Sequence, residues 1–157
     1  METVFTSEPV ASRFVREEYF PVRIDFGDQA DYSRHVELVR GDTDLAEVAT
    51  DPETGALRRI LIVLCNHYRY EEGCVPVPAC DEGGLLLEMP RVTECDAFEL
   101  AVYEDGLRLA LSRREAERRI RCGQAVLGFD ACLGIVELLV DGLGPEDIAH
   151  IRRELEG

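Results

Sequence analysis

Residues 57–65 contain the feature that most restricts the fold, a run of five consecutive apolar residues from Ile60 to Leu64. A strand with one face in solvent alternates apolar and polar residues, so a run without alternation predicts a strand covered on both faces. Pro52 and Gly55 lie shortly before it and favour a turn, because Pro fixes φ and Gly accepts positive φ. We therefore expect a central strand here, entered from a turn.

Apolar residues elsewhere mostly alternate with polar ones, which predicts several half-buried strands. Asp105 and Gly106 form a preferred pair for a hairpin turn between two of them, so neighbouring strands should be antiparallel. The strands that we predict cover residues 22–26, 35–39, 45–49, 57–65, 85–89, 98–103, 107–111, 125–129 and 135–140.

Three segments carry helix signals. Residues 8–19 have apolar side chains near helical spacing, Ser112 and Glu115 form a capping box that opens a helix to about residue 121, and Pro145 suits the first turn of a last helix. Together with the strands, these signals predict an α+β fold in a single domain over residues 1–157. It has an antiparallel sheet of hairpins with two or three helices packed on it.

The composition indicates a soluble protein of a reducing compartment. The chain of 157 residues has six cysteines, which is few for a disulfide scaffold, and most of them lie in or beside apolar segments. It has no run of 18 apolar residues, so no membrane helix is expected. Glu2 and Glu8 occupy the place where a secretory signal needs positive charge. We therefore predict a cytoplasmic location.

The charge is strongly unbalanced, with 32 acidic residues against 17 basic ones, all arginine, and a net charge of −15. Clustered cations are needed to bind phosphate backbones, so nucleic acid is not an expected partner. The acids concentrate in residues 25–53 and 71–105, whereas residues 108–121 hold six arginines. Acidic segments that face one way would attract a basic protein, and pairing of the basic segment with acids of its own chain is the alternative use of its charge.

Aromatic residues lie among the acids and make these segments candidate contact surfaces. Tyr and Arg are favoured at the centres of protein interfaces, and residues 67–84 form a long loop of the kind that often carries function. The predicted partner-binding residues are Asp28, Asp31, Tyr32, Asp42, Asp44, Glu47, Tyr68, Tyr70, Glu71 and Glu72.

Metal binding and catalysis are the alternatives. Cys65, His67, Cys74 and Cys80 could supply four nitrogen and sulfur ligands to zinc, but their spacing is not a common zinc pattern. A nucleophilic cysteine would need His67 or His35 beside it in a cleft. No phosphate-binding glycine loop or dinucleotide fingerprint is present. The sequence therefore predicts no metal, no cofactor and no catalytic residue, and it keeps a Cys/His metal protein or enzyme as the second hypothesis.

The last part of the chain resembles the ending of several small bacterial immunity proteins, which are encoded beside polymorphic or contact-dependent toxins. The resemblance rests on residues 127–130, 133–138 and 142–148, a hairpin followed by a helix start with the pattern Gly-Leu-x-x-Glu-x-Ile. It implies an intracellular, acidic, non-enzymatic protein that covers its toxin. The leading hypothesis is thus an immunity protein for a basic toxin domain. A structural or adaptor domain of a bacterial assembly is the third hypothesis, and the oligomeric state stays open.

Overall fold

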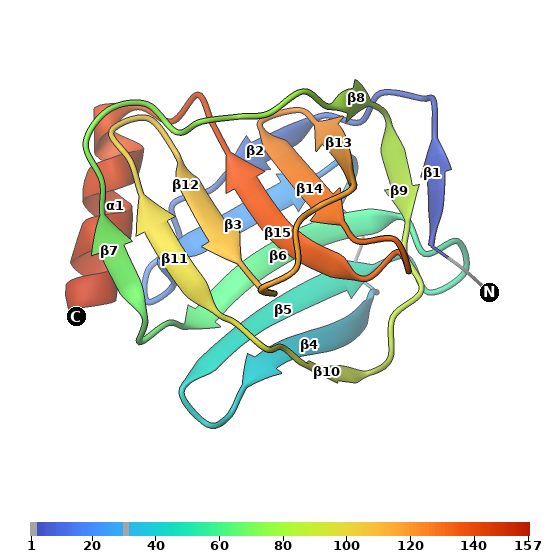
Figure 1. The fold of residues 1–157 in the computed structure, drawn as a ribbon, viewed down its shortest axis with the longest axis horizontal. Helices are drawn as coiled ribbons and strands as arrows, with labels where there is room; N and C mark the ends of the chain where they lie inside the picture. The colour runs from blue at the N-terminus through green and yellow to red at the C-terminus, as the bar shows by residue number, and fades with distance from the viewer. Residues whose placement is uncertain (1–2, 30–31) are drawn as a thin grey trace.

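The computed structural model describes residues 3–29 and 32–157, and within these ranges it contains fifteen strands and one helix (Figure 1). The predicted α+β class is therefore wrong, because the protein is mostly β. The elements are β1 (Val4–Thr6), β2 (Ser12–Phe14), β3 (Val22–Phe26), β4 (Arg34–Arg40), β5 (Asp44–Thr50), β6 (Leu57–Leu64), β7 (Tyr68–Tyr70), β8 (Asp81–Glu82), β9 (Gly84–Leu86), β10 (Val92–Glu94), β11 (Glu99–Val102), β12 (Leu107–Ala110), β13 (Arg118–Cys122), β14 (Ala125–Phe129), β15 (Ile135–Val140) and α1 (Pro145–Glu156).

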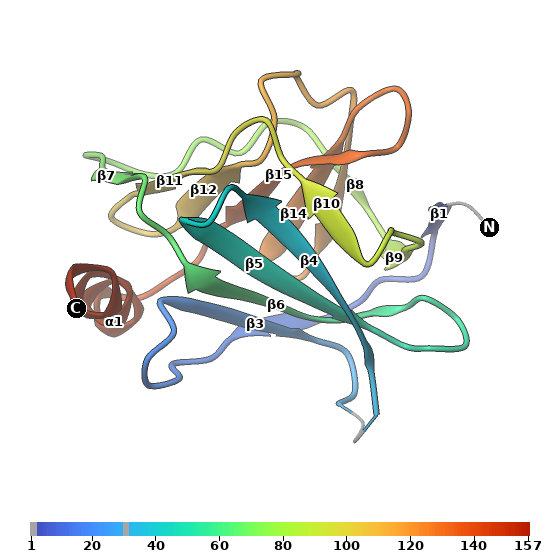
Figure 2. The same cartoon turned by 90° about the horizontal axis from the view of Figure 1, so that it is seen from below.

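Two large sheets pack face to face (Figure 2). The first has six strands in the order β10-β4-β5-β6-β3-β2, and the second has seven in the order β7-β11-β12-β15-β14-β13-β8. A small sheet pairs β1 with β9. The strands of the two large sheets cross in projection rather than run side by side (Figure 1), as in sandwiches whose sheets pack at a wide angle.

The core lies between these sheets and follows from the alternation of side chains along each strand. Val22, Ile24 and Phe26 of β3 belong to the same buried cluster as Leu107 and Leu109 of β12, so the inward faces of both sheets share one core. β6 is central in its sheet, as predicted, with β5 and β3 as neighbours. The outward residues of β6 are unequally covered, because Leu61 is buried whereas Val63 is only half-buried.

Two of the three predicted helices are wrong, because each segment holds a strand and irregular backbone instead. The segment over residues 8–19 contains β2, where the Ser12 hydroxyl accepts a hydrogen bond from the backbone N–H of Gln124 at 2.8 Å. In the segment 112–121, the Ser112 hydroxyl accepts from the Arg114 N–H, and the chain then enters β13, which pairs with β14. Ser residues can bond nearby backbone outside helices, so the capping signal did not require one.

The predicted last helix is confirmed as α1. Pro145 occupies its first turn, and Glu146 and Asp147 follow there, where acids complement the helix dipole. Ile148 and Ile151 are buried, so the helix closes one end of the space between the sheets (Figure 2). Within the described ranges, no helix is both long and apolar enough to cross a membrane.

The predicted long loop over residues 67–84 is ordered by the second sheet. It begins with β7 at one edge of that sheet and reaches β8 at the opposite edge. Residues 71–80, which we call the strap, connect these two edge strands (Figure 1). Val75 of the strap packs on Val126 and Leu139, which point away from the main core. The strap therefore covers part of the outer face of the seven-stranded sheet.

Candidate functional site

A groove of about 290 Å³ lies between the β7–β11 edge and α1. Its lining includes the apolar side chains of Val102 and Ile148 together with the rings of Tyr70 and Tyr103. Glu71 and Glu104 line the same groove, and Arg152 is the one arginine among its described lining residues. We call this the acidic groove. It combines an apolar surface with carboxylates, which is the chemistry that accepts a lysine or arginine side chain.

Tyr70 fixes one wall of the acidic groove. Its hydroxyl donates to Glu156 Oε1 at 2.7 Å, and the guanidinium of Arg152 lies 4.0 Å from the centre of its ring. Burial and then the bond to Glu156 raise the pKa of Tyr70 to about 12. The Tyr68 ring lies 5.9 Å from the Tyr70 ring and is partly exposed beside the groove. The predicted residues Tyr68, Tyr70 and Glu71 thus lie together, with Glu72 exposed next to them in the chain.

The acids of the β4–β5 hairpin differ in their surroundings. Asp42 is exposed in the turn, as a contact residue should be. Asp44 is only 1% exposed, which corrects the prediction that it offers its charge to a partner. Its carboxylate accepts hydrogen bonds from the Asn66 backbone N–H at 2.8 Å and the Thr43 hydroxyl at 2.9 Å, and it pairs with His67 Nδ1 at 3.0 Å. Asp44 therefore holds the crossover from β6 to β7 in place.

The remaining predicted contacts are scattered. Glu47 points outward from β5 and pairs with His35 Nδ1 at 2.7 Å. Asp28 and the strongly exposed Tyr32 precede β4, whereas Asp42 follows it. Seven strand residues separate the two ends by about 20 Å. Asp31 falls outside the described residues. The sequence-predicted set is therefore not one surface, and its largest group is the one at the acidic groove.

The four candidate metal ligands do not come together. Cys65 packs against the main core, Cys80 packs in the separate cluster under the strap, and Cys74 is exposed. Across residues 3–29 and 32–157, no group of three or more His, Cys, Asp or Glu side chains is arranged to hold a metal ion. This geometry gives no support to the zinc hypothesis.

Cys65 also lacks the features of a nucleophile. Its thiol is directed at the backbone oxygen of His67, at 3.5 Å, and the His67 ring pairs with Asp44. Burial raises the pKa of Cys65 to about 12, the opposite of the lowered pKa that reactive thiols need.

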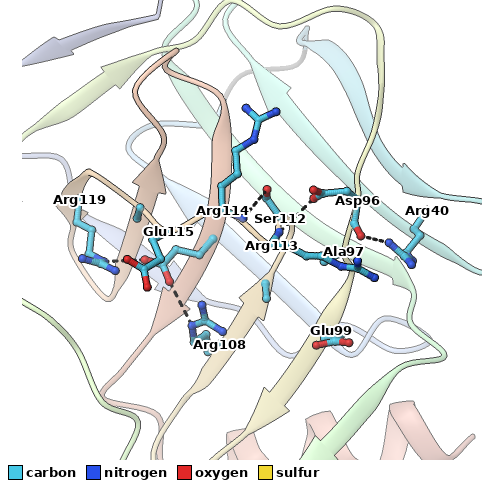
Figure 3. A pocket seen from close by; sticks show the side chains of 13 residues that line it. Arg40, Asp96, Ala97, Glu99, Arg108, Ser112, Arg113, Arg114, Glu115 and Arg119 are labelled. Atoms are coloured by element: carbon cyan, nitrogen blue, oxygen red, sulfur yellow. Dashed lines mark hydrogen bonds and ion pairs between the residues drawn. The ribbon is translucent and has the colours of Figure 1, made fainter.

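A larger hollow of about 580 Å³ opens on the outer face of the seven-stranded sheet, beside the area that the strap covers (Figure 3). We call it the arginine pocket. Every large side chain that lines it is charged, and its apolar residues are alanines. The lining residues are Arg40, Asp96, Ala97, Glu99, Arg108, Ala110, Ser112, Arg113, Arg114, Glu115, Ala116, Arg119 and Glu137.

An ion triad forms the floor of this pocket. Glu137 of β15 is only 3% exposed, and its two oxygens accept from Arg119 Nε at 2.6 Å and Arg108 Nε at 3.2 Å. Gly128 lies opposite Glu137 on β14, and a Cβ there would come within 2.5 Å of Glu137 Cγ. The missing side chain of Gly128 lets the carboxylate extend across β14 toward Arg119 on β13.

Sequence reasoning missed this pocket, although it left open that the basic segment pairs with acids of its own chain. That pairing is present, because Arg119 bonds Glu137, Arg114 pairs with Asp130 at 3.1 Å and Arg121 with Asp141 at 2.8 Å. A glutamate at an outward position of an otherwise apolar strand was the available signal.

Comparison with known proteins adds no relative: no family model matches the chain, and no curated protein matches it. The resemblance to immunity proteins therefore stays a prediction.

Proposed function

We propose that this protein is a non-catalytic inhibitor that binds a basic protein partner through the acidic groove and the side chains around it, in the manner of an immunity protein that covers a toxin domain. The observation that carries the proposal is the groove itself, where the carboxylates of Glu71 and Glu104 border an apolar surface. Such a surface accepts the long stem and the charged end of a lysine or arginine.

The surroundings of the groove support the same proposal. Leu64 and Tyr68 are exposed on the strands that lead into and out of the β6–β7 crossover, at 48% and 36%. Tyr70 is held by Glu156 and by Arg152, which covers one face of its ring, so this wall of the groove loses little conformational freedom on binding. Because the whole chain carries a net charge of −15, it would also attract a basic protein before contact.

The experiment compares two triple variants that change the net charge equally. Glu71→Gln, Glu72→Gln and Glu104→Gln neutralise the groove, whereas Asp28→Asn, Glu53→Gln and Asp81→Asn neutralise exposed acids elsewhere. The wild-type protein captures its partner from an extract of the native source at low salt, mass spectrometry identifies the partner, and its affinity for each purified variant is then measured.

The proposal expects a basic partner whose affinity falls at least tenfold in the groove variant and changes little in the other. Equal losses in both variants would mean that the attraction is general and that the acidic groove is not the contact. Failure of the wild-type protein to retain any basic protein would overturn the proposed function.

A further inference from the structure

The arginine pocket has an excess of positive charge at its floor. One buried carboxylate, that of Glu137, is shared by Arg108 and Arg119, and each arginine uses only its Nε atom for that contact. The terminal nitrogens of both guanidinium groups make no hydrogen bond to another described residue. Because a guanidinium has five N–H donors, the two ends of this triad still have donors to offer. The side chains of Arg108 and Arg119 are 38% and 24% exposed, so those donors are accessible from the pocket.

Three more arginines line the hollow, and one of them, Arg114, is paired with Asp130. Arg40 donates to the backbone oxygen of Asp96, and the Arg113 backbone N–H donates to Asp96 Oδ1 at 3.2 Å. Among the described residues, the Arg113 guanidinium has no hydrogen-bond or ion-pair partner. Figure 3 shows Arg108 and Arg119 on one side of the hollow and Arg40 beside Asp96 on the other. Guanidinium groups therefore face the cavity from both sides.

The lining also restricts the ligand. Among the residues that the structure describes, it contains no aromatic ring and no apolar side chain larger than alanine, so the pocket is unsuited to a nucleobase or an acyl chain. The exposed carboxylates of Glu99 and Glu115 lie among the lining residues and oppose the entry of large polyanions. A volume of about 580 Å³ suits a small molecule.

We propose that the arginine pocket binds a small, strongly polar molecule through an oxyanion, a phosphate or carboxylate group, that completes the hydrogen bonding of Arg108 and Arg119 opposite Arg113. Guanidinium groups bind both oxyanions through paired N–H bonds. The site lies on the outer face of the seven-stranded sheet and uses none of the side chains of the acidic groove, so it is independent of the proposed inhibitor function.

The test is calorimetric titration of the full chain with inorganic phosphate and, separately, with acetate, in a buffer of low ionic strength. We expect saturable binding of one equivalent of at least one probe, and the probe that binds identifies the oxyanion. Arg113→Ala should weaken binding about tenfold, because its guanidinium would supply one charged hydrogen bond. The control, Arg13→Ala, removes the same charge from an exposed position on β2 and should leave the affinity unchanged.

A second variant separates the contribution of the planar pair of guanidinium donors from that of the positive charge. Arg119→Lys keeps a positive charge beside Glu137, which protects the fold, but it removes the planar donor pair, so we expect a further loss of about tenfold or more. Binding of neither probe, or binding that both pocket variants leave unchanged, would overturn the proposal.

Discussion

The strap covers one half of the outer face of the seven-stranded sheet and leaves the other half open to solvent, although the same strands build both halves. We call these the dry half and the open half. On β15, Leu139 belongs to the dry half and Glu137 to the open half, two residues apart. On β14 the corresponding residues are Val126 and Gly128, which pair with them across the strands. Two residues further along each strand, the apolar cross-strand pair of Val126 and Leu139 thus gives way to a pair of Gly128 and Glu137.

The segments that pass over the two halves differ in polarity in the same way as the strands beneath them. The strap brings Val75, Val77 and Cys80 onto the dry half and excludes water from it. The segment over residues 112–117 supplies serine, arginine, glutamate and alanine and borders the open half without filling it. The polarity of each outward strand position thus matches that of the segment that crosses it.

Leu139→Ala should cause the largest loss of stability. The side chain is 1% exposed under the strap, so its truncation leaves a cavity and should lower the free energy of unfolding by about 3 kcal/mol. Urea denaturation measures this, with Val63→Ala, a half-buried outward residue of β6, as the control expected to lose about 1 kcal/mol. Equal losses in the two variants would show that the strap does not make its half a second core.

Gly128→Ala should follow with a loss of about 2 kcal/mol, because the new methyl group would overlap both Glu137 and Ala116. The combination with Glu137→Ala removes one of the two clashing side chains, so the double variant should lose less than the sum of the single losses. Simple additivity in urea denaturation would contradict the close approach of Gly128 and Glu137.

Arg119→Ala should lower stability by about 1.5 kcal/mol, because it leaves the buried Glu137 with one weaker partner. Arg108→Ala should lose less, since its bond to Glu137 is longer and its side chain more exposed. Glu137→Gln in the Arg119→Ala background removes the buried charge, which Arg108 alone then compensates, and should restore part of the loss. If thermal unfolding shows no recovery, the loss comes from the arginine stem rather than from its charge.

Asp130→Asn should have the smallest effect, and that effect should depend on pH. Asp130 accepts backbone hydrogen bonds from Gly134 and Cys132 and pairs with Arg114, and these contacts lower the pKa of Asp130. A carboxyl group whose pKa is lower in the folded protein stabilises it above the ordinary pKa, near 4, and loses this contribution as the pH falls through the folded value.

The wild-type protein should therefore be more stable than Asp130→Asn at pH 7, and the two should converge at acidic pH, once Asp130 is protonated in the folded protein as well. Urea midpoints measured across this range check the sign. A difference that is constant with pH would mean that the charge of Asp130 does not contribute to stability.

Local patterns predicted the elements whose environment follows from their own residues. The apolar run from Ile60 to Leu64 correctly indicated a central strand, and Asp105 and Gly106 correctly indicated the hairpin of β11 and β12. The helix signals over residues 8–19 and 112–121 failed, because distant strands decide those conformations: Ser12 bonds to Gln124, and Glu117 donates to Phe129. The fold class was wrong for this reason.

The candidate sites, too, could be predicted only where their residues are close in the sequence. Tyr68, Tyr70, Glu71 and Glu72 are consecutive or nearly so, and sequence reasoning placed them together. The arginine pocket requires knowing that β12, β15, β14 and β13 are neighbours in that order, which no local pattern reveals. Asp44 looked like a surface acid because nothing nearby in the sequence shows that Asn66 and His67 return to it.

The contact of Ser12 with Gln124 joins residues 112 positions apart, and β1 likewise pairs with β9. A chain emerging from the ribosome therefore presents β1 long before β9 exists, and Ser12 long before Gln124, although β2 finds its partner strand β3 early. Contacts between residues far apart in the sequence form slowly, so folding should finish only after synthesis has passed β15. Until then, the early strands would depend on chaperones or on their charge to avoid aggregation. The excess of acidic residues would thus serve the nascent chain as well as the mature protein.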